Sequence, residues 1–213
     1  MAGMGSDWRE HAAKSELAKL VNELRPGEVD AWLDAATPRL NETVRVNPCR
    51  IDLNWTQDLL CQMGAKPIEW FKQKGGAYTM PWKKARCENE LFMKNLRALH
   101  ASGRITRQEA ASMMPVQALN VQPGDRVLDL CAAPGSKTTQ IAETLNGKGL
   151  VVANEPNPGR ANNLVSNVQR SGHLNVVVVR EDGRNFPRVA EPGFDRILVD
   201  APCTGTGTTR MNT

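Results

Sequence analysis

The 213-residue sequence contains no apolar run of the roughly 18 residues that a membrane span requires. Its first residues are charged and contain no apolar signal core, so we expect a protein that is not secreted. Its five cysteines are scattered and form no C-x-x-C pair, which argues against a disulfide framework or a structural zinc site. We therefore expect reduced thiols, no bound metal, no membrane contact and an intracellular location, in either the nucleus or the cytoplasm.

The sequence also lacks internal repeats and low-complexity segments, and its 40% hydrophobic and 23% charged residues are typical of a globular protein. In residues 15–24 the apolar positions have helical spacing, Ser15 can cap the helix, and Pro26-Gly27 ends it. A second short helix is expected through Val29 and Leu33. Residues 1–36 are therefore predicted to form a helical extension.

Residues 37–115 are predicted to form a small α+β subdomain. The alternating apolar residues of 43–55 indicate a strand, a turn at Asn47-Pro48, and a second strand through Ile51 and Leu53. Helices are expected over residues 56–63 and 87–103, and over 106–119 with an interruption at Pro115.

From residue 116 onward the pattern changes. Four apolar segments alternate with helices that start near Ser136 and Arg160, and these segments are residues 126–131, 149–155, 175–182 and 194–202. Strands that alternate with helices indicate a parallel, doubly wound α/β sheet. Because the Val/Leu runs are continuous, we expect strands that are covered on both faces.

The segment from 66 to 107 is basic, with ten Lys or Arg residues against three acids. Such a stretch is commonly a solvated face, and the alternative is contact with a phosphate backbone. The interleaved aromatic residues either belong to the core or stack on unpaired bases. They are Trp70, Phe71, Tyr78 and Trp82.

The turn after the first of the four strands is the most informative motif. In doubly wound sheets ligands bind beyond the carboxyl ends of the strands, at turns of this kind. The segment has neither the Gly-Lys-Ser/Thr order of a P-loop nor the three spaced glycines of a dinucleotide site. Its small residues instead let the backbone approach the amino-acid half of S-adenosylmethionine. The predicted cofactor contacts here are Cys131, Ala132, Ala133, Pro134, Gly135, Ser136 and Lys137.

The next two strands end in acids that suit the same cofactor. Glu155 can accept hydrogen bonds from two ribose hydroxyls, and Asp182 can accept one from the adenine amino group. The fourth strand ends in Asp200-Ala-Pro-Cys203, which places a thiol beyond the strand, where reactivity matters more than packing. From the residues alone, Cys203 is the candidate nucleophile.

These motifs resemble the Nop/Sun family of RNA cytosine carbon-5 methyltransferases, over roughly residues 35–213. The segments that carry the resemblance are VRVNPCRID, GRITRQEAASMMP, VLDLCAAPGSKTTQ, ANEPNPGR, EDGRNFP and DRILVDAPCTGTG. Two of them, SGRITRQEAASMMP and CAAPGSKTTQ, are most similar to the transfer-RNA branch. The resemblance implies RNA, with tRNA first, as the partner and S-adenosylmethionine as the cofactor.

The resemblance also implies the chemistry. A thiolate adds to carbon 6 of cytosine and loads electron density onto carbon 5, which takes the methyl group. Asp200 is expected beside both the sulfonium and the cytosine ring, where its proton assists the addition. In the family the Pro-Cys thiol, here Cys203, assists product release, and the attacking cysteine lies in a later Thr-Cys segment. With an RNA enzyme in view, we interpret Lys83, Lys84 and Arg86 as RNA contacts.

Residues 116–213 are thus predicted to be the N-terminal four strands of a Rossmann-like class I methyltransferase sheet that is incomplete at its C-terminus. We expect a truncated chain that lacks methyl transfer by itself and leaves an apolar edge at RILVDA exposed. The alternatives are an inactive RNA-binding or cofactor-binding module, and rRNA rather than tRNA as substrate. A methyltransferase for protein or small molecules is disfavoured, because the Asn/Asp-Pro-Pro-Tyr strand ending is absent.

Overall fold

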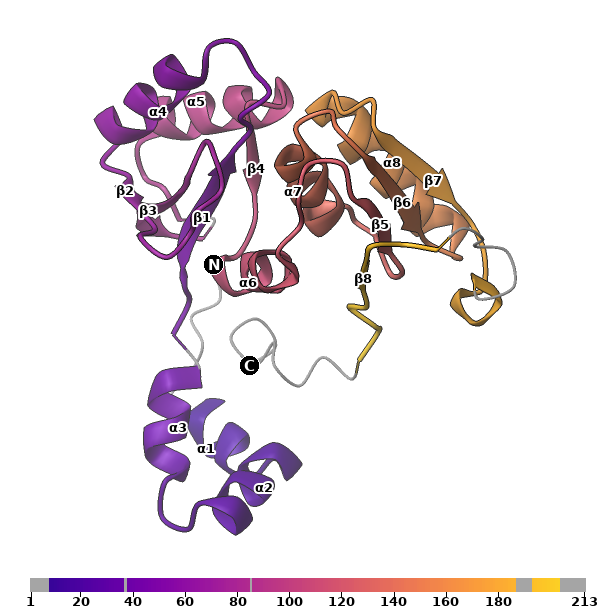
Figure 1. The fold of residues 1–213 in the computed structure, drawn as a ribbon. Coiled ribbons are helices and arrows are strands. Elements are labelled where there is room, and N and C mark those ends of the chain that lie inside the picture. Colours follow the sequence, from indigo (N-terminus) through magenta and orange to yellow (C-terminus); the bar gives the residue numbers. More distant parts are fainter. Residues whose placement is uncertain (1–7, 37, 85, 187–192, 204–213) are drawn as a thin grey trace. The chain divides into compact units, whose positions relative to one another are not determined.

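The computed structural model describes residues 8–36, 38–84, 86–186 and 193–203 (Figure 1). The described residues form two compact units, one with the N-terminal residues up to Leu40 together with Cys203, the other with Asn41–Pro202. None of the helices in these ranges has the length and apolar content of a membrane span. Residues 204–213, the last part of the predicted methyltransferase segment, lie outside the described residues.

The first unit is helical, as predicted. It contains α1 (Trp8–Ala13), α2 (Glu16–Leu24) and α3 (Val29–Ala36). Ser15 caps α2, because its hydroxyl oxygen accepts a hydrogen bond from the Ala18 amide at 3.1 Å. Ala18 and Leu33 supply buried apolar side chains.

The second unit begins with an antiparallel sheet of order β2-β3-β1-β4 (Figure 1). Its strands are β1 (Asn41–Val46), β2 (Lys66–Pro67), β3 (Ala77–Lys83) and β4 (Ile105–Arg107). Helices α4 (Leu53–Gln62) and α5 (Glu90–Ala101) contribute Leu60 and Leu96 to a core that also contains Val44, Met80 and Ile105. This confirms an α+β arrangement.

Two local predictions in this region are wrong. Leu53 does not belong to a strand but begins α4, and the side chain of Ile51 is fully exposed in the preceding turn. The Asp52 carbonyl starts the helix by accepting hydrogen bonds from both the amide and the hydroxyl of Thr56. The other error concerns α6 (Ala110–Leu119). It begins later than expected, because residues 106 and 107 belong to β4, and it continues through Pro115, near which Met113 and Val116 are buried.

The second sheet is Rossmann-like, as predicted; its strand order is β7-β6-β5-β8, and all of its strands pair in parallel. Its strands are β5 (Arg126–Asp129), β6 (Leu150–Asn154), β7 (Val176–Val179) and β8 (Arg196–Leu198). Two helices, α7 (Ser136–Leu145) and α8 (Pro158–Ser171), connect the first three strands, and the short helix η1 (Gly183–Asn185) follows β7. The first strand along the chain, β5, therefore lies inside the sheet, where its carboxyl end is flanked by those of β6 and β8.

The prediction that both faces of this sheet are covered is wrong for its outer strands. Helices α6, α7 and α8 pack on the face that carries Val127 and Val151. The register places Val177 and Ile197 on the opposite face, and their side chains are 48% and 51% exposed. In this sheet, continuous valine runs therefore do not show that both faces of a strand are covered.

The two sheets of the second unit meet through reciprocal contacts at helix C-termini. The Asn47 side-chain amide donates to the Gly103 carbonyl and to the Ser171 carbonyl at the end of α8, both at 3.0 Å. In return, Arg170 Nη1 of α8 donates to the His100 carbonyl in the last turn of α5 at 2.7 Å. Helix α6 crosses the expected boundary between residues 115 and 116, and the proposed domain limits stay predictions.

Candidate functional site

The turn that follows β5 is held by the strands on both sides of it. The Leu130 amide donates to the Leu198 carbonyl of β8, and the Ala132 amide donates to the Asn154 carbonyl of β6. Ala132 and Ala133 are buried, so the small residues of this turn lie against the sheet. The turn therefore has a defined place at the carboxyl end of the sheet.

Gly135 ends the turn and begins α7. Its φ is +106°, a left-handed conformation, and a Cβ built on it would lie 2.9 Å from Leu164 Cδ1 of α8. Only glycine fits both the backbone conformation and this contact. The first amides of α7 have no partners within the helix, so a helix that begins here directs N–H donors at a ligand above the turn.

Lys137 connects the first turn of α7 to the end of β8. Its Nζ lies 2.7 Å from Asp200 Oδ2. The side chain of Lys137 is 17% exposed and that of Asp200 is 57% exposed, so the pair lies at the surface of the site. The structure thus brings Asp200 close to the turn that follows β5.

Asp129 is a buried carboxylate at the tip of β5 that sequence reasoning missed. Its Oδ2 accepts a hydrogen bond from Thr138 Oγ1 at 2.7 Å, whereas Oδ1 is buried and has no hydrogen-bond partner among the described residues. Burial raises the pKa of this carboxyl to about 6, and the Thr138 hydrogen bond opposes the rise. The signal available in the sequence is an acid inside the apolar strand RVLDL.

Glu155, at the end of β6, is also buried and is 2% exposed. Its Oε1 accepts from the Asn157 amide at 3.0 Å, and its Oε2 lies 3.4 Å from Arg160 Nη1. Arg160 Nη2 donates to the Ala133 carbonyl at 3.0 Å, so this arginine joins the acid to the turn. Sequence reasoning missed Arg160, although it lies within the ANEPNPGR motif.

Asn154 ties the ends of three strands together. Its Nδ2 donates to the carbonyls of Leu130 and Glu181, and its Oδ1 accepts from the Glu181 amide. This arrangement brings the neighbouring Asp182 to the same edge of the sheet. The Asp182 carboxylate accepts hydrogen bonds from Arg184, and these lower the pKa of Asp182 to about 2.

The predicted RNA contacts lie in another part of the second unit. Lys83 is the last residue of β3, Lys84 and Arg86 follow it in the chain, and all three are exposed. Cys203 is exposed and belongs to the first compact unit. All five cysteines are free thiols.

The aromatic residues of the basic segment divide into two groups. Phe71 and Tyr78 belong to the core, whereas Trp70 is 42% exposed. Trp82 is partly buried against Phe92, with ring centroids 6.1 Å apart. Of the four, Trp70 alone retains an exposed ring for stacking.

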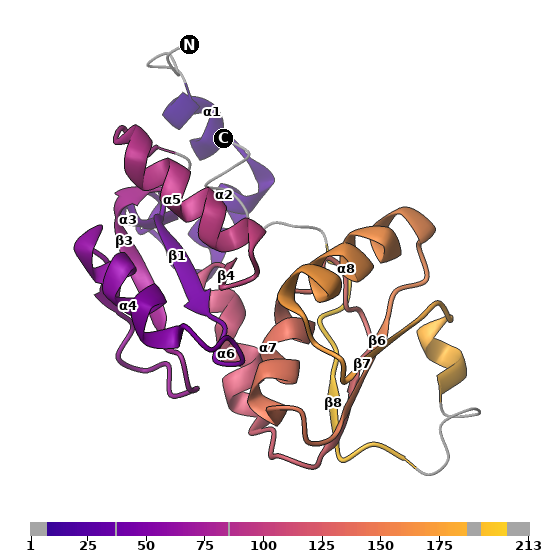
Figure 2. The same cartoon turned by 90° about the horizontal axis from the view of Figure 1, so that it is seen from above.

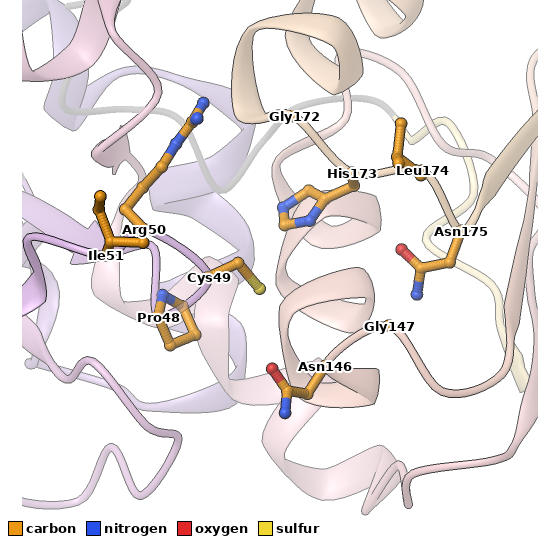
Figure 3. Close-up of a pocket in the computed structure, with 10 residues that line it drawn as sticks. All are labelled: Pro48, Cys49, Arg50, Ile51, Asn146, Gly147, Gly172, His173, Leu174 and Asn175. Carbon is orange, nitrogen blue, oxygen red and sulfur yellow. The ribbon is translucent and has the colours of Figure 1, made fainter.

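A cavity of about 460 Å³ lies at the amino ends of strands of the parallel sheet, opposite their carboxyl ends (Figure 3). Its walls come from the loop after β1 and from the loops that precede β6 and β7, and Cys49 and His173 lie on different walls. The residues that line it are Pro48–Ile51, Asn146–Gly147 and Gly172–Asn175. None of the predicted cofactor contacts belongs to this cavity.

The sheet order, the small-residue turn and the acids at the tips of β5 and β6 define the class of protein: a Rossmann-like methyltransferase fold. A solved methyltransferase homologue from Pyrococcus horikoshii has this fold, with a TM-score of 0.74 and 27% identity over 98% of this chain and 66% of that one. Residues 116–213 match the family model described as 16S rRNA methyltransferase RsmB/F. The match confirms the resemblance of this part of the chain to the Nop/Sun family.

Two curated relatives extend the similarity beyond this part of the chain. The multisite-specific tRNA (cytosine-C5)-methyltransferase of Saccharomyces cerevisiae is 44% identical in an alignment of 143 positions that covers 59% of this chain and 21% of the yeast protein. The ribosomal RNA small subunit methyltransferase F of Serratia proteamaculans is 39% identical in an alignment of 190 positions that covers 86% of this chain and 38% of the relative. The chain spans between 13% and 41% of the length of the curated relatives it matches.

Proposed function

We propose that this chain forms the cofactor-binding and RNA-contacting part of an S-adenosylmethionine-dependent RNA (cytosine-5)-methyltransferase. The observation that carries the proposal is the convergence of Asp129, Glu155 and Asp182 on the turn before Gly135, at one edge of the parallel sheet. When bound, S-adenosylmethionine supplies an activated methyl group. The residues of this chain bind and orient that donor and the base.

The side chains at this edge fit the donor. The unpartnered, buried Oδ1 of Asp129 suits a cationic N–H donor such as the α-ammonium group of the amino-acid half. Glu155 keeps free lone pairs for the two ribose hydroxyls, since its known contacts use one hydrogen bond and one ion pair. Asp182 already accepts a hydrogen bond from Arg184, so in this proposal its carboxylate accepts from both Arg184 and the adenine amino group.

The end of β8 acts on the base in this proposal. Asp200 is held beside the donor by Lys137 and carries a proton to the ring nitrogen of cytosine. Cys203, three residues further along the chain, supplies the exposed thiol that assists product release. The alternative role of this thiol is attack on carbon 6.

The cofactor site is tested with Glu155→Gln, which removes the charge but keeps the shape of the ribose acceptor. We expect the Kd for S-adenosylmethionine to rise at least about tenfold, because hydrogen bonds to a charged acceptor are lost. Equilibrium dialysis measures the change. The matched control is Glu181→Gln, an exposed neighbour at the same edge, which should leave the Kd unchanged. Equal affinities for wild type and Glu155→Gln would contradict the assignment.

We propose tRNA as the substrate, a choice supported by the likeness to the yeast tRNA enzyme. Ribosomal RNA is the second candidate, because the family model and the Serratia relative are described by rRNA. Competition between tRNA and rRNA transcripts for binding to the chain separates the two. If rRNA binds more tightly than tRNA, rRNA becomes the first candidate substrate.

RNA binding by Lys83, Lys84 and Arg86 is tested by the salt dependence of affinity. The double variant Lys83→Glu/Lys84→Glu should weaken tRNA binding for all sequences and flatten the salt slope, because phosphate contacts release counterions. Lys14→Glu/Lys19→Glu makes the same change of charge in exposed lysines of the first unit and serves as the control. If both double variants lose affinity equally, the effect is one of net charge, and the three residues are a solvated face.

A further inference from the structure

Arg45 of β1 is an arginine from the antiparallel sheet that is buried against the helix of the candidate site. Its side chain is 0% exposed. Figures 1 and 2 both show α7 on the side of the parallel sheet that faces β1 and β4. A fully buried guanidinium needs partners for all of its donors, and most of the partners of Arg45 lie on α7.

The guanidinium holds the first turn of α7 directly. Arg45 Nη2 donates to the Ser136 carbonyl at 3.2 Å and to Thr139 Oγ1 at 3.0 Å. The Thr139 hydroxyl in turn donates to the same Ser136 carbonyl at 3.1 Å. These three contacts fix the turn that begins at Gly135, where the helix amides face the proposed ligand.

The other side of the guanidinium is anchored independently of that turn. Nη1 donates to Glu143 Oε2, one turn further along α7, and Nε donates to Gln108 Oε1 at 3.1 Å. Gln108 also donates to Gln140 Oε1 at 3.1 Å. The planar fork of arginine makes all these contacts at once, whereas a lysine ammonium is a single point of charge that cannot span them.

We propose that Arg45 is a positioning residue for the cofactor turn, through which the antiparallel subdomain sets the affinity for the amino-acid half of the donor. The inference rests on the proposed function, because it assumes that the turn holds that half. Arg45 itself does not touch the ligand. It fixes the direction of the amides at the start of α7, so that their hydrogen bonds to the amino-acid half need no ordering when the ligand binds.

The test compares two ligands that differ in that half. S-adenosylhomocysteine carries the amino-acid group, and 5′-methylthioadenosine lacks it. For Arg45→Lys in the full chain we expect the Kd for S-adenosylhomocysteine to rise about tenfold, and the Kd for methylthioadenosine to stay within about twofold. Arg107→Lys is the matched control, since Arg107 directs a comparable fork at Glu42 of β1, and it should change neither Kd.

Thr139→Val provides a second variant for the case in which Arg45→Lys does not fold. It removes one acceptor of Arg45 from the first turn and keeps the shape of the side chain. It should also raise the Kd for S-adenosylhomocysteine but not the Kd for methylthioadenosine, by a smaller factor than Arg45→Lys does. A loss of the same size for both ligands, or no loss for either, in these variants would overturn the proposal. A wild-type chain that binds neither ligand would instead refute the proposed function.

Discussion

At the scale of single residues, the site depends on Gly135. Two separate requirements meet there, a left-handed backbone and the close approach of Leu164 from α8. Gly124 has nearly the same φ, +105°, but nothing lies within 4 Å of a Cβ built on it. Substituting the two glycines in turn therefore distinguishes the cost of backbone strain from the cost of a steric clash.

We expect Gly124→Ala to cost about 1 kcal/mol of unfolding free energy, from backbone strain alone. Gly135→Ala should cost about 2–4 kcal/mol, because the methyl group also displaces Leu164. Urea denaturation of both variants measures the difference. Equal costs would mean that α8 moves aside freely and that the turn is not confined by it.

The pH dependence of stability is expected to carry a contribution from Asp129. Its pKa in the folded protein is raised to about 6, so the folded state binds the proton more tightly than the unfolded state. The resulting stabilisation is fully present below about pH 4 and is lost as the pH rises through 6. The total is about 3 kcal/mol.

Asp129→Asn removes this titration and keeps the acceptor for Thr138. The difference in unfolding free energy between wild type and variant should therefore shift in favour of the variant between pH 4 and pH 7. Comparing the two proteins cancels the titration of the other carboxyls. A difference that does not change with pH would show that Asp129 titrates normally.

The residues of the site differ in how well the sequence predicts them. Glu155 and Asp200 follow apolar strands, and the carboxyl ends of parallel strands share one edge, so their place could be predicted. Asp129 was missed because an acid inside a strand has no periodic signal. Arg160 was missed because its contact with Ala133 depends on how α8 folds back over the turn.

At the scale of elements, the parallel sheet buries one face far better than the other. Val151 of β6 is fully buried under the helices, whereas Val177 of β7 is 48% exposed on the opposite face. Valines that look alike in the sequence therefore contribute unequally to stability.

Val151→Ala should lower the unfolding free energy by about 2 kcal/mol, since it leaves a cavity in the core. Val177→Ala should lower it by less than about 1 kcal/mol, because half of the side chain is already in water. Chemical denaturation distinguishes the two. Comparable losses would indicate that the face of Val177 is covered in solution.

The order and type of most elements were predictable because the periodicity of apolar residues and the capping residues agree. The errors arose where local signals are short. Ile51 and Leu53 have the spacing of a strand. Two apolar residues are too few to form a strand where Asp52 can begin a helix. Pro115 weakens α6 locally, and tertiary packing of Met113 and Val116 outweighs that loss.

At the scale of the whole second unit, the two sheets are joined by buried polar groups rather than by apolar packing alone. Arg45 and Glu143 are separated by 98 residues, and Asn47 and Ser171 by 124. Pairs this far apart leave no trace in local patterns, so a single sequence could not predict them. Residues 41–202 should unfold in one transition as a result.

Asn47→Ala tests this coupling, because it removes the side-chain donor to the Gly103 carbonyl and leaves the Ser171 carbonyl only its longer contact with Arg50 Nη2, at 3.4 Å. We expect a loss of about 2–3 kcal/mol and faster amide exchange on both sides of the junction. Asn41→Ala removes one hydrogen bond, to Met80, within the antiparallel sheet and should affect that sheet alone. Faster exchange confined to the antiparallel sheet in Asn47→Ala would contradict the coupling.

The central claim is that the carboxyl edge of the parallel sheet binds S-adenosylmethionine. Isothermal titration calorimetry of the folded 213-residue chain with S-adenosylmethionine, and with ATP and NAD⁺ as comparison ligands, tests it most directly. We predict saturable heat at one site for S-adenosylmethionine and none for the other two nucleotides. A folded chain that gives no heat with S-adenosylmethionine, or that binds all three alike, would contradict the account.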